Sequence, residues 1–321
     1  MLSFPKISTV FFISMSIILF IGCKVKYQPT GGMHTINVKS SADTKNFFRY
    51  SKDRIPFVSA HRGGPLPGFP ENCIATFENT LRNTYAILEI DPHFTKDSAI
   101  VVMHDITLDR TSNGKGKIAD YTLSELRKLQ LKDTKGALTP YGIPTLDEAL
   151  KWAKGKTILV IDAKEVPVET RVMKIEENNA EANAIVIVYS YEEARKCYAM
   201  NKNIVMELMV PNRKKFEELD ATGIPWENII AFVTHTKPQE ADIFHLIHAK
   251  GSMCIVGSSR TIDRSYIRGE IKEYDSLQFK YREIINSGAD VIEADLAIDA
   301  GKALAPLLTN KSGKYKYFRK Q

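Results

Sequence analysis

The amino-acid sequence predicts an α/β protein with a (β/α)8 TIM barrel, and three observations carry that prediction. The chain has 321 residues, a length that suits one large α/β domain or two small ones. Apolar residues make up 44% of it and charged residues 26%, which are the proportions of globular proteins with a full core. After about residue 54, short β-branched runs alternate with helical stretches, the pattern of a parallel sheet with crossover helices.

Nine short apolar runs are candidate strands: 57–60, 86–90, 99–103, 157–161, 184–188, 204–208, 228–233, 252–256 and 290–294. Too few residues separate Asp91 from Ile100 for a parallel crossover, which needs about a dozen. Lys96-Asp97-Ser98 favours a turn, so the third run is predicted to form an antiparallel hairpin with the run before it. The eight remaining runs match the strand number of a TIM barrel, with an extra hairpin strand after the second barrel strand. Helices are expected between them at 75–85, 123–131, 146–154, 168–178, 191–200, 213–222, 239–250 and 276–287.

The N-terminus predicts export. Lys6 precedes an apolar run at 7–21, which is short for a bilayer span of about 20 residues and typical of a signal peptide. Residues 19–23, Leu-Phe-Ile-Gly-Cys, resemble a bacterial lipobox, so residues 1–22 are predicted to be a lipoprotein signal peptide and Cys23 to be lipidated. The prediction is an exported lipoprotein anchored in a membrane of the bacterial cell envelope. An uncleaved anchor and an ordinary signal peptide are the open alternatives, and both also imply export.

The rest of the chain divides by composition. Residues 23–54 are polar and are predicted to be a flexible tether, residues 55–310 the catalytic barrel domain, and residues 311–321 a solvated basic tail. The net charge of +6 comes without a dense basic block and does not indicate nucleic acid as a partner. Three further cysteines lack C-x-x-C spacing and are expected to be buried thiols: Cys73, Cys197 and Cys254. The oligomeric state is not predicted.

Polar clusters follow the apolar runs at or just beyond their ends. Active sites of TIM barrels collect at the carboxyl ends of the strands, so these clusters are expected to share one polar mouth. They are His61-Arg62-Gly63-Gly64 with Glu71-Asn72, Glu89-Ile90-Asp91, His104-Asp105, and Asp162-Ala163-Lys164.

Glu89 and Asp91 predict a metal site. They stand two residues apart on a strand, so both carboxylates face the same side. Hard oxygen ligands in this arrangement suit one divalent cation, Mg²⁺ or Ca²⁺, with Asp162 from a nearby strand as a third ligand. A glycosidase pair is the alternative, but its carboxylates stand at least about 5 Å apart across a substrate bond, and neighbouring same-face positions meet that spacing only marginally.

The hairpin predicts where His104 lies. If its turn is centred between Asp97 and Ser98, then Asp91 pairs across from His104, with Cβ atoms about 5 Å apart on one face. His61 arrives from the end of the first strand. A slip of the register by one residue would move His104 to the other face.

Two histidines beside a metal predict phosphodiester cleavage. One imidazole, His61 or His104, deprotonates the attacking oxygen, and the other protonates the leaving alkoxide. The metal, Arg62 and Lys164 neutralise the charge that develops on the phosphoryl oxygens. The alternatives are the same centre acting on intact phospholipid or on a phosphodiester polymer, and an inactive lipoprotein that binds phosphodiesters.

The order of these motifs resembles the glycerophosphodiester phosphodiesterase family. The matching segments are His61-Arg62-Gly63, Glu71-Asn72, Glu89-Ile90-Asp91, Thr95-Lys96-Asp97, Val102-Met103-His104-Asp105, Leu108-Asp109-Arg110-Thr111 and Pro144-Thr145-Leu146-Asp147-Glu148-Ala149-Leu150. The resemblance implies a barrel of the phosphatidylinositol-phospholipase C type and hydrolysis of a small glycerophosphodiester to sn-glycerol 3-phosphate and an alcohol. It also implies one divalent cation, Ca²⁺ or Mg²⁺.

The resemblance carries roles over to single residues. It implies that His61 and His104 are the acid–base pair, and that Arg62 and Lys164 contact the phosphate. The implied metal ligands are Glu89, Asp91 and Asp162. The implied supporting residues are Glu71 and Asn72.

The chain also departs from the family pattern. Asp162 stands where Glu is usual, and Gly257-Ser258-Ser259-Arg260 stands where Trp-Thr is common. The last strand ends Glu293-Ala294-Asp295-Leu296-Ala297 in place of Thr-Asp-x-Pro. These later segments line the substrate pocket in the family, so the alcohol is not predicted. Glu207 and Glu293 could add polar groups to the pocket or form buried structural hydrogen bonds. Arg260 could bind an anionic headgroup or form a surface salt bridge.

Overall fold

Eight parallel strands close into a barrel in the computed structural model, which describes residues 32–321. Their order around the barrel is β10-β11-β2-β3-β6-β7-β8-β9, which confirms the predicted TIM-barrel fold. The barrel strands are β2 (Phe57–Ala60), β3 (Ala86–Ile90), β6 (Leu159–Ile161), β7 (Ala184–Val188), β8 (Met206–Met209), β9 (Ile229–Thr234), β10 (Cys254–Gly257) and β11 (Val291–Ala294).

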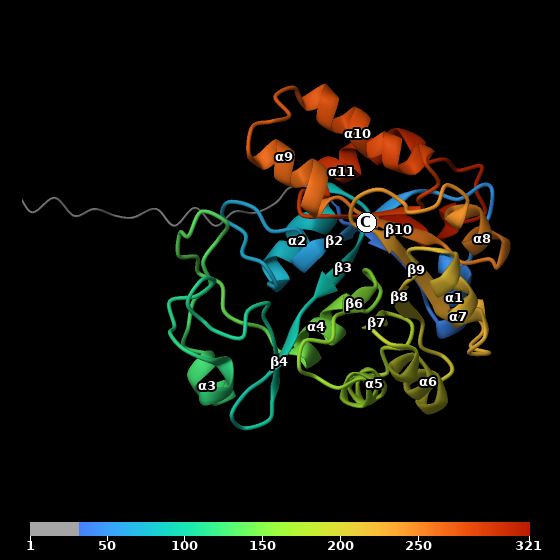
Figure 1. Ribbon diagram of the computed structural model, residues 1–321. Helices are drawn as coiled ribbons and strands as arrows, with labels where there is room; N and C mark the ends of the chain where they lie inside the picture. Colours follow the sequence, from blue (N-terminus) through green and yellow to red (C-terminus); the bar gives the residue numbers. More distant parts are fainter. Residues whose placement is uncertain (1–31) are drawn as a thin grey trace, which may run out of the picture. The chain divides into compact units, whose positions relative to one another are not determined.

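Helices lie around the outside of the barrel (Figure 1). In α4, Leu146, Ala149, Leu150 and Ala153 are buried, the spacing of a helix with one apolar face, and Thr145 caps its N-terminus in a capping box. None of the helices within residues 32–321 has the length and apolar character that a membrane span requires. The helices that cover the barrel are α2 (Ile74–Asn83), α4 (Leu146–Ala153), α5 (Val168–Glu177), α6 (Tyr191–Met200), α7 (Arg213–Asp220), α8 (Ile243–Ala249), α10 (Tyr274–Asn286) and α11 (Ala297–Leu304).

The barrel strands bury both faces, and alternate side chains belong to two layers of core. Val160 of β6 packs inside the barrel with Ile87 of β3 and Ile185 of β7, whereas its neighbours Leu159 and Ile161 pack with the helix layer. Both faces of most strands are therefore largely apolar, which explains why the strands read as nearly continuous apolar runs. The three cysteines of the described chain are buried free thiols, as predicted.

Between β3 and β6 the chain leaves the barrel and builds a small separate lobe, to one side of the helix ring in Figure 1. It contains the hairpin β4 (Pro92–Phe94) and β5 (Ile100–Val102) and the short helix α3 (Leu123–Leu126). The predicted hairpin after the second barrel strand is confirmed. The lobe has its own apolar core of Cys73, Val101, Met103, Leu108, Ile118, Leu126, Leu131 and Ile143.

The predicted register of this hairpin is wrong by one residue. Pro92 pairs with Val102, and the Met103 N–H donates to the Asp91 carbonyl at 2.7 Å, so Asp91 faces Met103 and not His104. The cause is the turn: it is a three-residue loop centred on Asp97, with Ser98 in the left-handed region at φ 62°. His104 lies beyond the end of β5, so the alternation of the strand does not decide which way its side chain points.

The two ends of the described chain meet in a two-stranded sheet. β1 (His34–Ile36) pairs antiparallel with β12 (Phe318–Lys320), with Ile36 opposite Phe318. Helix α1 (Ser41–Phe48) follows β1 and buries Phe47, which packs against the rings of Phe57 and Phe318. These apolar groups close the end of the barrel where the strands begin, and they extend its inner core.

The prediction of a flexible tether at 23–54 and of a solvated tail at 311–321 therefore differs from the structure. From Met33 onward the first segment is folded against the barrel, and Tyr317 and Phe318 of the second are buried. The physical reason is long-range pairing: neither segment has enough apolar residues to form a core alone, but together they cover the apolar end of the barrel. The predicted signal peptide at 1–22 and the lipidated Cys23 lie outside the described residues.

A buried carboxylate attaches the N-terminal segment to the start of β11, the last strand of the barrel. Asp290 is fully buried and forms an ion pair with Arg54 and a hydrogen bond with His248 Nε2 at 2.8 Å. It also accepts from the Cys254 N–H at 2.7 Å. The Tyr50 ring stacks on His248, with ring centroids 3.6 Å apart. Removing the charge of Asp290 would leave Arg54 without a carboxylate partner.

Asp290→Asn is expected to lower the free energy of unfolding by about 3–5 kcal/mol, because it breaks a buried ion pair by removing one partner. Urea unfolding followed by circular dichroism measures the change. Glu177→Gln is the control, since Glu177 pairs with Lys174 on the exposed surface and its loss is expected to change stability by about 0.5 kcal/mol or less. Equal effects of the two substitutions would contradict the role assigned to Asp290.

Candidate active site

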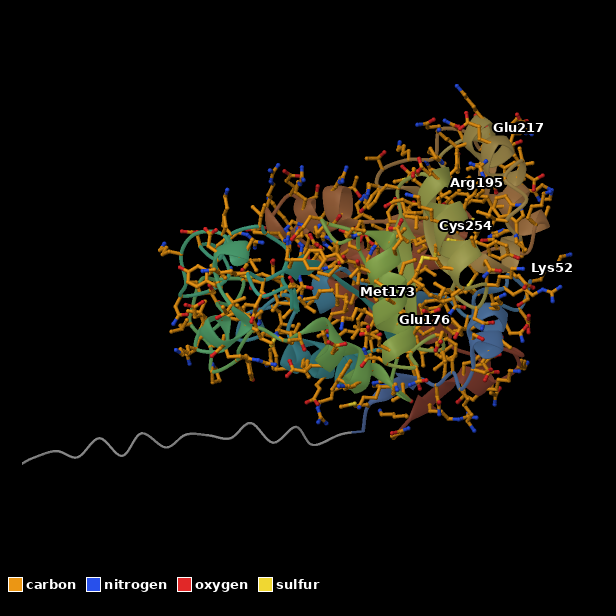
Figure 2. The ribbon with its side chains drawn as sticks, turned by 90° about the horizontal axis from the view of Figure 1, so that it is seen from below. Lys52, Met173, Glu176, Arg195, Glu217 and Cys254 are labelled. Carbon is orange, nitrogen blue, oxygen red and sulfur yellow. The ribbon has the colours of Figure 1, made fainter. Side chains whose placement is uncertain are left out.

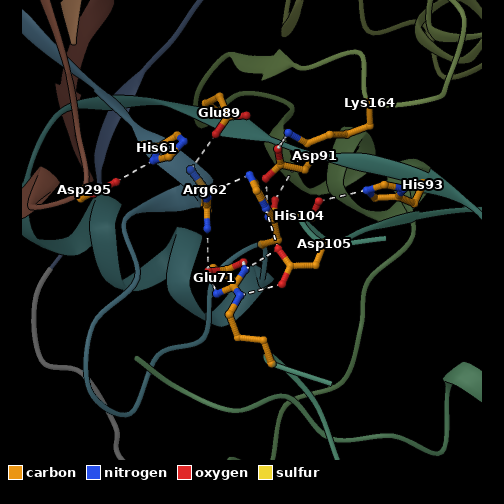
Figure 3. Close-up of polar contacts among 12 residues, drawn as sticks. His61, Arg62, Glu71, Glu89, Asp91, His93, His104, Asp105, Lys164 and Asp295 are labelled. Carbon is orange, nitrogen blue, oxygen red and sulfur yellow. Dashed lines mark hydrogen bonds and ion pairs between the residues drawn. The ribbon is translucent and has the colours of Figure 1, made fainter. Parts of the chain in front are cut away.

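A cavity of about 490 Å³ opens at the carboxyl ends of the barrel strands. Six of the residues selected from the sequence line it: His61, Arg62, Glu89, His104, Asp162 and Lys164. Asp91 and Glu71 do not line the cavity but contact Lys164 and Arg62, respectively (Figure 3). Asn72 forms a hydrogen bond with Asp91. The structure thus brings every predicted site residue of the barrel into one cluster.

The turn after β2 places His61 and Arg62. Arg62 has a left-handed backbone, φ 52°, and its N–H donates to Glu89 Oε2 at 2.7 Å. Gly63 follows at φ 81°, and a Cβ there would stand 2.3 Å from the Phe77 ring, so only glycine fits. Asn72 and Lys164 also have positive φ, at 56° and 43°. Non-glycine residues in this region mark local strain, and here three of them belong to the predicted site.

His61 is held by a carboxylate from the neighbouring strand. Its Nδ1 lies 2.6 Å from Oδ1 of Asp295, just after β11, which pairs with β2 in the barrel. Burial by itself lowers the pKa of His61, but the hydrogen bond to Asp295 and the charges of Glu89 and Glu293 raise it to about 10. Asp295 was not among the predicted site residues. It occupies the place of the aspartate in the family's Thr-Asp-x-Pro pattern, and that match could have identified it from the sequence.

His104 is held in the same way from the other side. Its Nδ1 lies 2.8 Å from Asp105 Oδ1, and its Nε2 lies 2.8 Å from Nη2 of Arg62. A guanidinium only donates, so Nε2 accepts and Nδ1 carries the proton that is given to Asp105.

Arg62 and Arg110 are fixed by Glu71. The Glu71 carboxylate accepts from Arg62 Nη1 at 3.2 Å and from two nitrogens of Arg110, at 2.9 and 2.7 Å. Arg110 in turn donates to both oxygens of Asp105. The hydrogen bonds from Arg110 hold the pKa of Asp105 well below its usual range, although burial acts in the opposite direction. The supporting role predicted for Glu71 is thus to orient the arginine that contacts His104.

Glu89, Asp91 and Asp162 form a compact set of carboxylates. One oxygen from each lies within 4.8 Å of the others, and all three residues are buried. Asn72 positions Asp91, because its Nδ2 donates to Asp91 Oδ2 at 2.6 Å and its Oδ1 accepts from the Asp91 N–H at 3.1 Å. Burial, together with the Asp91 charge, raises the pKa of Glu89 well above its ordinary value. Three buried oxygen ligands at this spacing fit a hard divalent cation, and the shorter side chain of Asp162 still reaches the set.

Lys164 lies against these carboxylates. Its Nζ is 2.9 Å from Asp91 Oδ1 and 2.8 Å from Asp162 Oδ2, so its ammonium group neutralises part of their charge. Burial lowers the pKa of Lys164, but the two carboxylates outweigh it and the net shift is upward. The phosphate contact predicted for Lys164 stays a prediction, although the side chain does line the cavity.

Two further glutamates and a tyrosine complete the polar floor of the cavity. Glu207 on β8 and Glu293 on β11 line it, and burial raises the pKa of both carboxyls. Tyr189, which the sequence reading did not select, donates its hydroxyl to Asp162 at 2.5 Å. Burial raises the pKa of Asp162, but hydrogen bonds from Lys164 and Tyr189 outweigh it and leave the net shift downward.

Two other clusters of residues that could bind a metal occur in the described chain, and in each of them an arginine side chain already pairs with the carboxylates. His248, Cys254 and Asp290 include the ion pair with Arg54. The second group is Glu71, His104 and Asp105, which Arg110 bridges. The three carboxylates of the cavity are therefore the set best suited to a divalent cation.

Asp295→Asn is expected to lower the pKa of His61 below the value of about 10, because it removes the hydrogen-bonding carboxylate. A histidine with a raised pKa stabilises the fold fully below its unfolded value of about 6.5, and the contribution is lost as pH rises through the folded value. The stability difference between the wild type and Asp295→Asn should therefore shrink between pH 6.5 and 10. An NMR titration of metal-free protein measures the pKa, and an unchanged His61 titration would contradict the assignment.

Comparison with known proteins agrees with this geometry. The model of the glycerophosphoryl diester phosphodiesterase family matches residues 61–219. A crystal structure of a glycerophosphoryl diester phosphodiesterase from Parabacteroides distasonis superposes with a TM-score of 0.86 at 40% identity, covering 90% of this chain and 100% of that one.

Two curated relatives match over shorter regions. The glycerophosphodiester phosphodiesterase of Caldanaerobacter subterraneus subsp. tengcongensis is 34% identical over 160 residues, 47% of this chain and 65% of the relative. YhdW of Bacillus subtilis is 42% identical over 113 residues, 35% of this chain and 46% of YhdW. The matched region thus spans between about half and two thirds of these relatives. With the full coverage of the Parabacteroides structure, the chain belongs to the glycerophosphoryl diester phosphodiesterase family.

Proposed function

We propose that this protein hydrolyses small glycerophosphodiesters to sn-glycerol 3-phosphate and an alcohol, with a divalent cation. One observation carries the proposal: two carboxylate-held imidazoles, His61 and His104, line the same cavity as a buried carboxylate set. Arg62 connects the two parts, since its backbone N–H contacts Glu89 and its guanidinium contacts His104.

The two imidazoles supply the proton transfers of phosphodiester hydrolysis. A carboxylate holds each imidazole at Nδ1, Asp295 for His61 and Asp105 for His104, so Nε2 is the proposed reacting nitrogen. In His104 this nitrogen contacts Arg62, which substrate binding would displace. One accepts the proton of the attacking oxygen, and the other returns a proton to the leaving alkoxide. Arg62 offers a planar donor fork to the phosphoryl oxygens, and its hydrogen bond to Glu71 orients that fork.

Glu89, Asp91 and Asp162 would hold the divalent cation, Ca²⁺ or Mg²⁺. A cation bound there supplies neutralisation of the charge that develops on the phosphoryl oxygens. Lys164 contacts two of the same carboxylates and adds a second positive charge at this side of the cavity. The buried carboxylates need such charges, because their burial and mutual repulsion oppose ionisation.

The test is a product assay with purified protein. Glycerophosphocholine, glycerophosphoethanolamine and glycerophosphoglycerol are each incubated with Ca²⁺ or Mg²⁺, and released glycerol 3-phosphate is measured enzymatically. The expected result is release that excess chelator abolishes and added cation restores. No release from any of these diesters under either cation would contradict the proposal. Faster turnover of phospholipid vesicles than of soluble diesters would instead favour an intact lipid as substrate.

The proposal includes attachment to a membrane of the bacterial cell envelope through a lipid on Cys23, after removal of residues 1–22. The lipobox-like sequence at 19–23 supports it. Cells expressing the wild type are expected to incorporate labelled palmitate into the protein, and Cys23→Ser to abolish the label. Equal labelling of both forms would contradict the attachment site.

A further inference from the structure

A row of arginines lies on the wall of the cavity beyond β10. Arg260, Arg264 and Arg268 all line the cavity, and all three are exposed. Arg260 lies on a π-turn at Ser259–Asp263, Arg264 begins α9 (Arg264–Ile267), and Arg268 directly follows that helix. The three side chains are four residues apart and line the same side of the cavity. None of the three forms an ion pair or a side-chain hydrogen bond with any residue of 32–321.

The absence of ion pairs and side-chain hydrogen bonds distinguishes them from the other cations of the cavity, although the charge of Arg264 acts on the Asp295 carboxylate. Lys164 is paired with two carboxylates, and Arg62 is bonded to Glu71 and His104. Like charges four residues apart on a helix repel each other and cost stability. Three such charges directed at one cavity therefore indicate an anionic ligand group that offsets the repulsion.

The segment that carries the arginines is held in place before any ligand binds. Asp263, in its middle, is fully buried and accepts hydrogen bonds from Ser258 Oγ at 3.0 Å, from Tyr281 Oη at 2.6 Å and from the Asp295 N–H at 2.7 Å. Local π-turns are rare and often occur at functional sites. A segment anchored in this way needs little backbone ordering when a ligand binds.

The same contacts place the arginine wall next to the reacting centre. Asp295 donates its N–H to Asp263 and accepts from His61 through its carboxylate. One residue thus joins the arginine segment to a proposed acid–base histidine. The charge of the reacting phosphodiester already has Arg62, Lys164 and the proposed cation as partners on the β2–β6 side. The arginines of the β10 side are in excess of what that single charge needs.

We propose that Arg260, Arg264 and Arg268 form a second anion site, which selects glycerophosphodiesters whose alcohol carries an additional phosphate group. The inference rests on the proposed function and names its substrate class. Guanidinium groups bind phosphate through paired hydrogen bonds, which explains why arginine occupies all three positions. A glycerophosphodiester of a sugar-alcohol phosphate fits this description, and one with an uncharged alcohol does not.

The first test compares two diesters that differ only in one phosphate, glycerophosphoinositol and glycerophosphoinositol 4-phosphate, in about 0.15 M salt. The wild type is expected to prefer the phosphorylated diester by about tenfold or more in kcat/KM. The double variant R260Q/R268Q is expected to lose that preference, since a hydrogen bond to a charged group contributes about a tenfold effect or more. The control is R195Q, on the outer helix α6 (Figure 2), which removes one exposed arginine charge outside the cavity lining and should keep the preference.

The second test measures binding without turnover. Inositol 4-phosphate and inositol are titrated into the metal-loaded protein by calorimetry, and R260Q/R268Q is expected to weaken binding of the phosphate about tenfold or more. If the wild type hydrolyses none of the diesters, the proposed function is wrong. Weaker binding of inositol 4-phosphate by R260Q/R268Q would still support the anion site in that case. Equal binding by the wild type and the variant would overturn the site. In the first test, an equal loss of kcat/KM on both diesters would also overturn the site. So would a variant that binds inositol 4-phosphate normally and loses only its binding to anionic lipid vesicles.

Discussion

His104→Ala is expected to lower kcat for glycerophosphodiester hydrolysis by about 10²- to 10⁴-fold, and His61→Ala by a similar factor. A positioned acid or base contributes on this scale, and each imidazole is already positioned by a carboxylate at Nδ1. The measurement is steady-state release of glycerol 3-phosphate by each single variant and by the double variant. The double variant should lose little more than either single one, because groups that act in one step are not additive.

The control is His245→Ala. His245 is exposed on α8, outside the cavity, and its removal should leave kcat within about twofold. Thermal unfolding of each variant shows whether the fold is kept. A His104→Ala variant that stays folded and keeps its wild-type rate would contradict the acid–base assignment.

Asp91→Asn is expected to abolish the stabilisation that a divalent cation gives to the protein. A ligand at 100 times its dissociation constant stabilises the native state by about 2.7 kcal/mol, which raises the melting temperature of a domain of this size by several degrees. Asp91 is buried beside Glu89 and Asp162, so its loss removes one of three oxygen ligands. Thermal unfolding of the wild type and of Asp91→Asn, with chelator and with a series of Ca²⁺ or Mg²⁺ concentrations, measures the effect independently of turnover.

The matched control for this experiment is Asp275→Asn. Asp275 lies on the exposed surface of α10, so its loss should leave the cation-induced shift unchanged. A shift of the same size in Asp91→Asn and the wild type would place the cation elsewhere. The activity of Asp91→Asn should fall together with its cation affinity.

Local pattern predicted much of the site. The alternation of side chains along a strand put Glu89 and Asp91 on one side of β3, and the rule for parallel barrels put His61 and Asp162 at the same end of their strands. The structure shows these residues together in the cavity. Both inferences depend only on residues that are close in the chain or at equivalent strand ends.

The register of the hairpin shows where local pattern was insufficient. Lys96-Asp97-Ser98 predicted a turn, but a two-residue and a three-residue loop differ by one position in register. The choice depended on the left-handed conformation of Ser98, which the residue type does not decide. His104 reaches the cavity because the chain bends beyond β5, where Arg62 and Asp105 hold its ring.

The sequence by itself determined the barrel, the strand ends that carry chemistry, and His61, His104, Glu89 and Asp162 of the cavity. Strand and helix periodicity and motif spacing are properties of short segments, so they are readable without coordinates. Only the tertiary structure decided that Asp295 holds His61, that Lys164 pairs with Asp91, and that β1 and β12 cover the end of the barrel where the strands begin. Those contacts join residues far apart in the chain. The pairing of β11 with β2 brings Asp295 to His61, and the pairing of β3 with β6 brings Lys164 to Asp91. β1 and β12 pair because the closed barrel leaves an apolar end to cover.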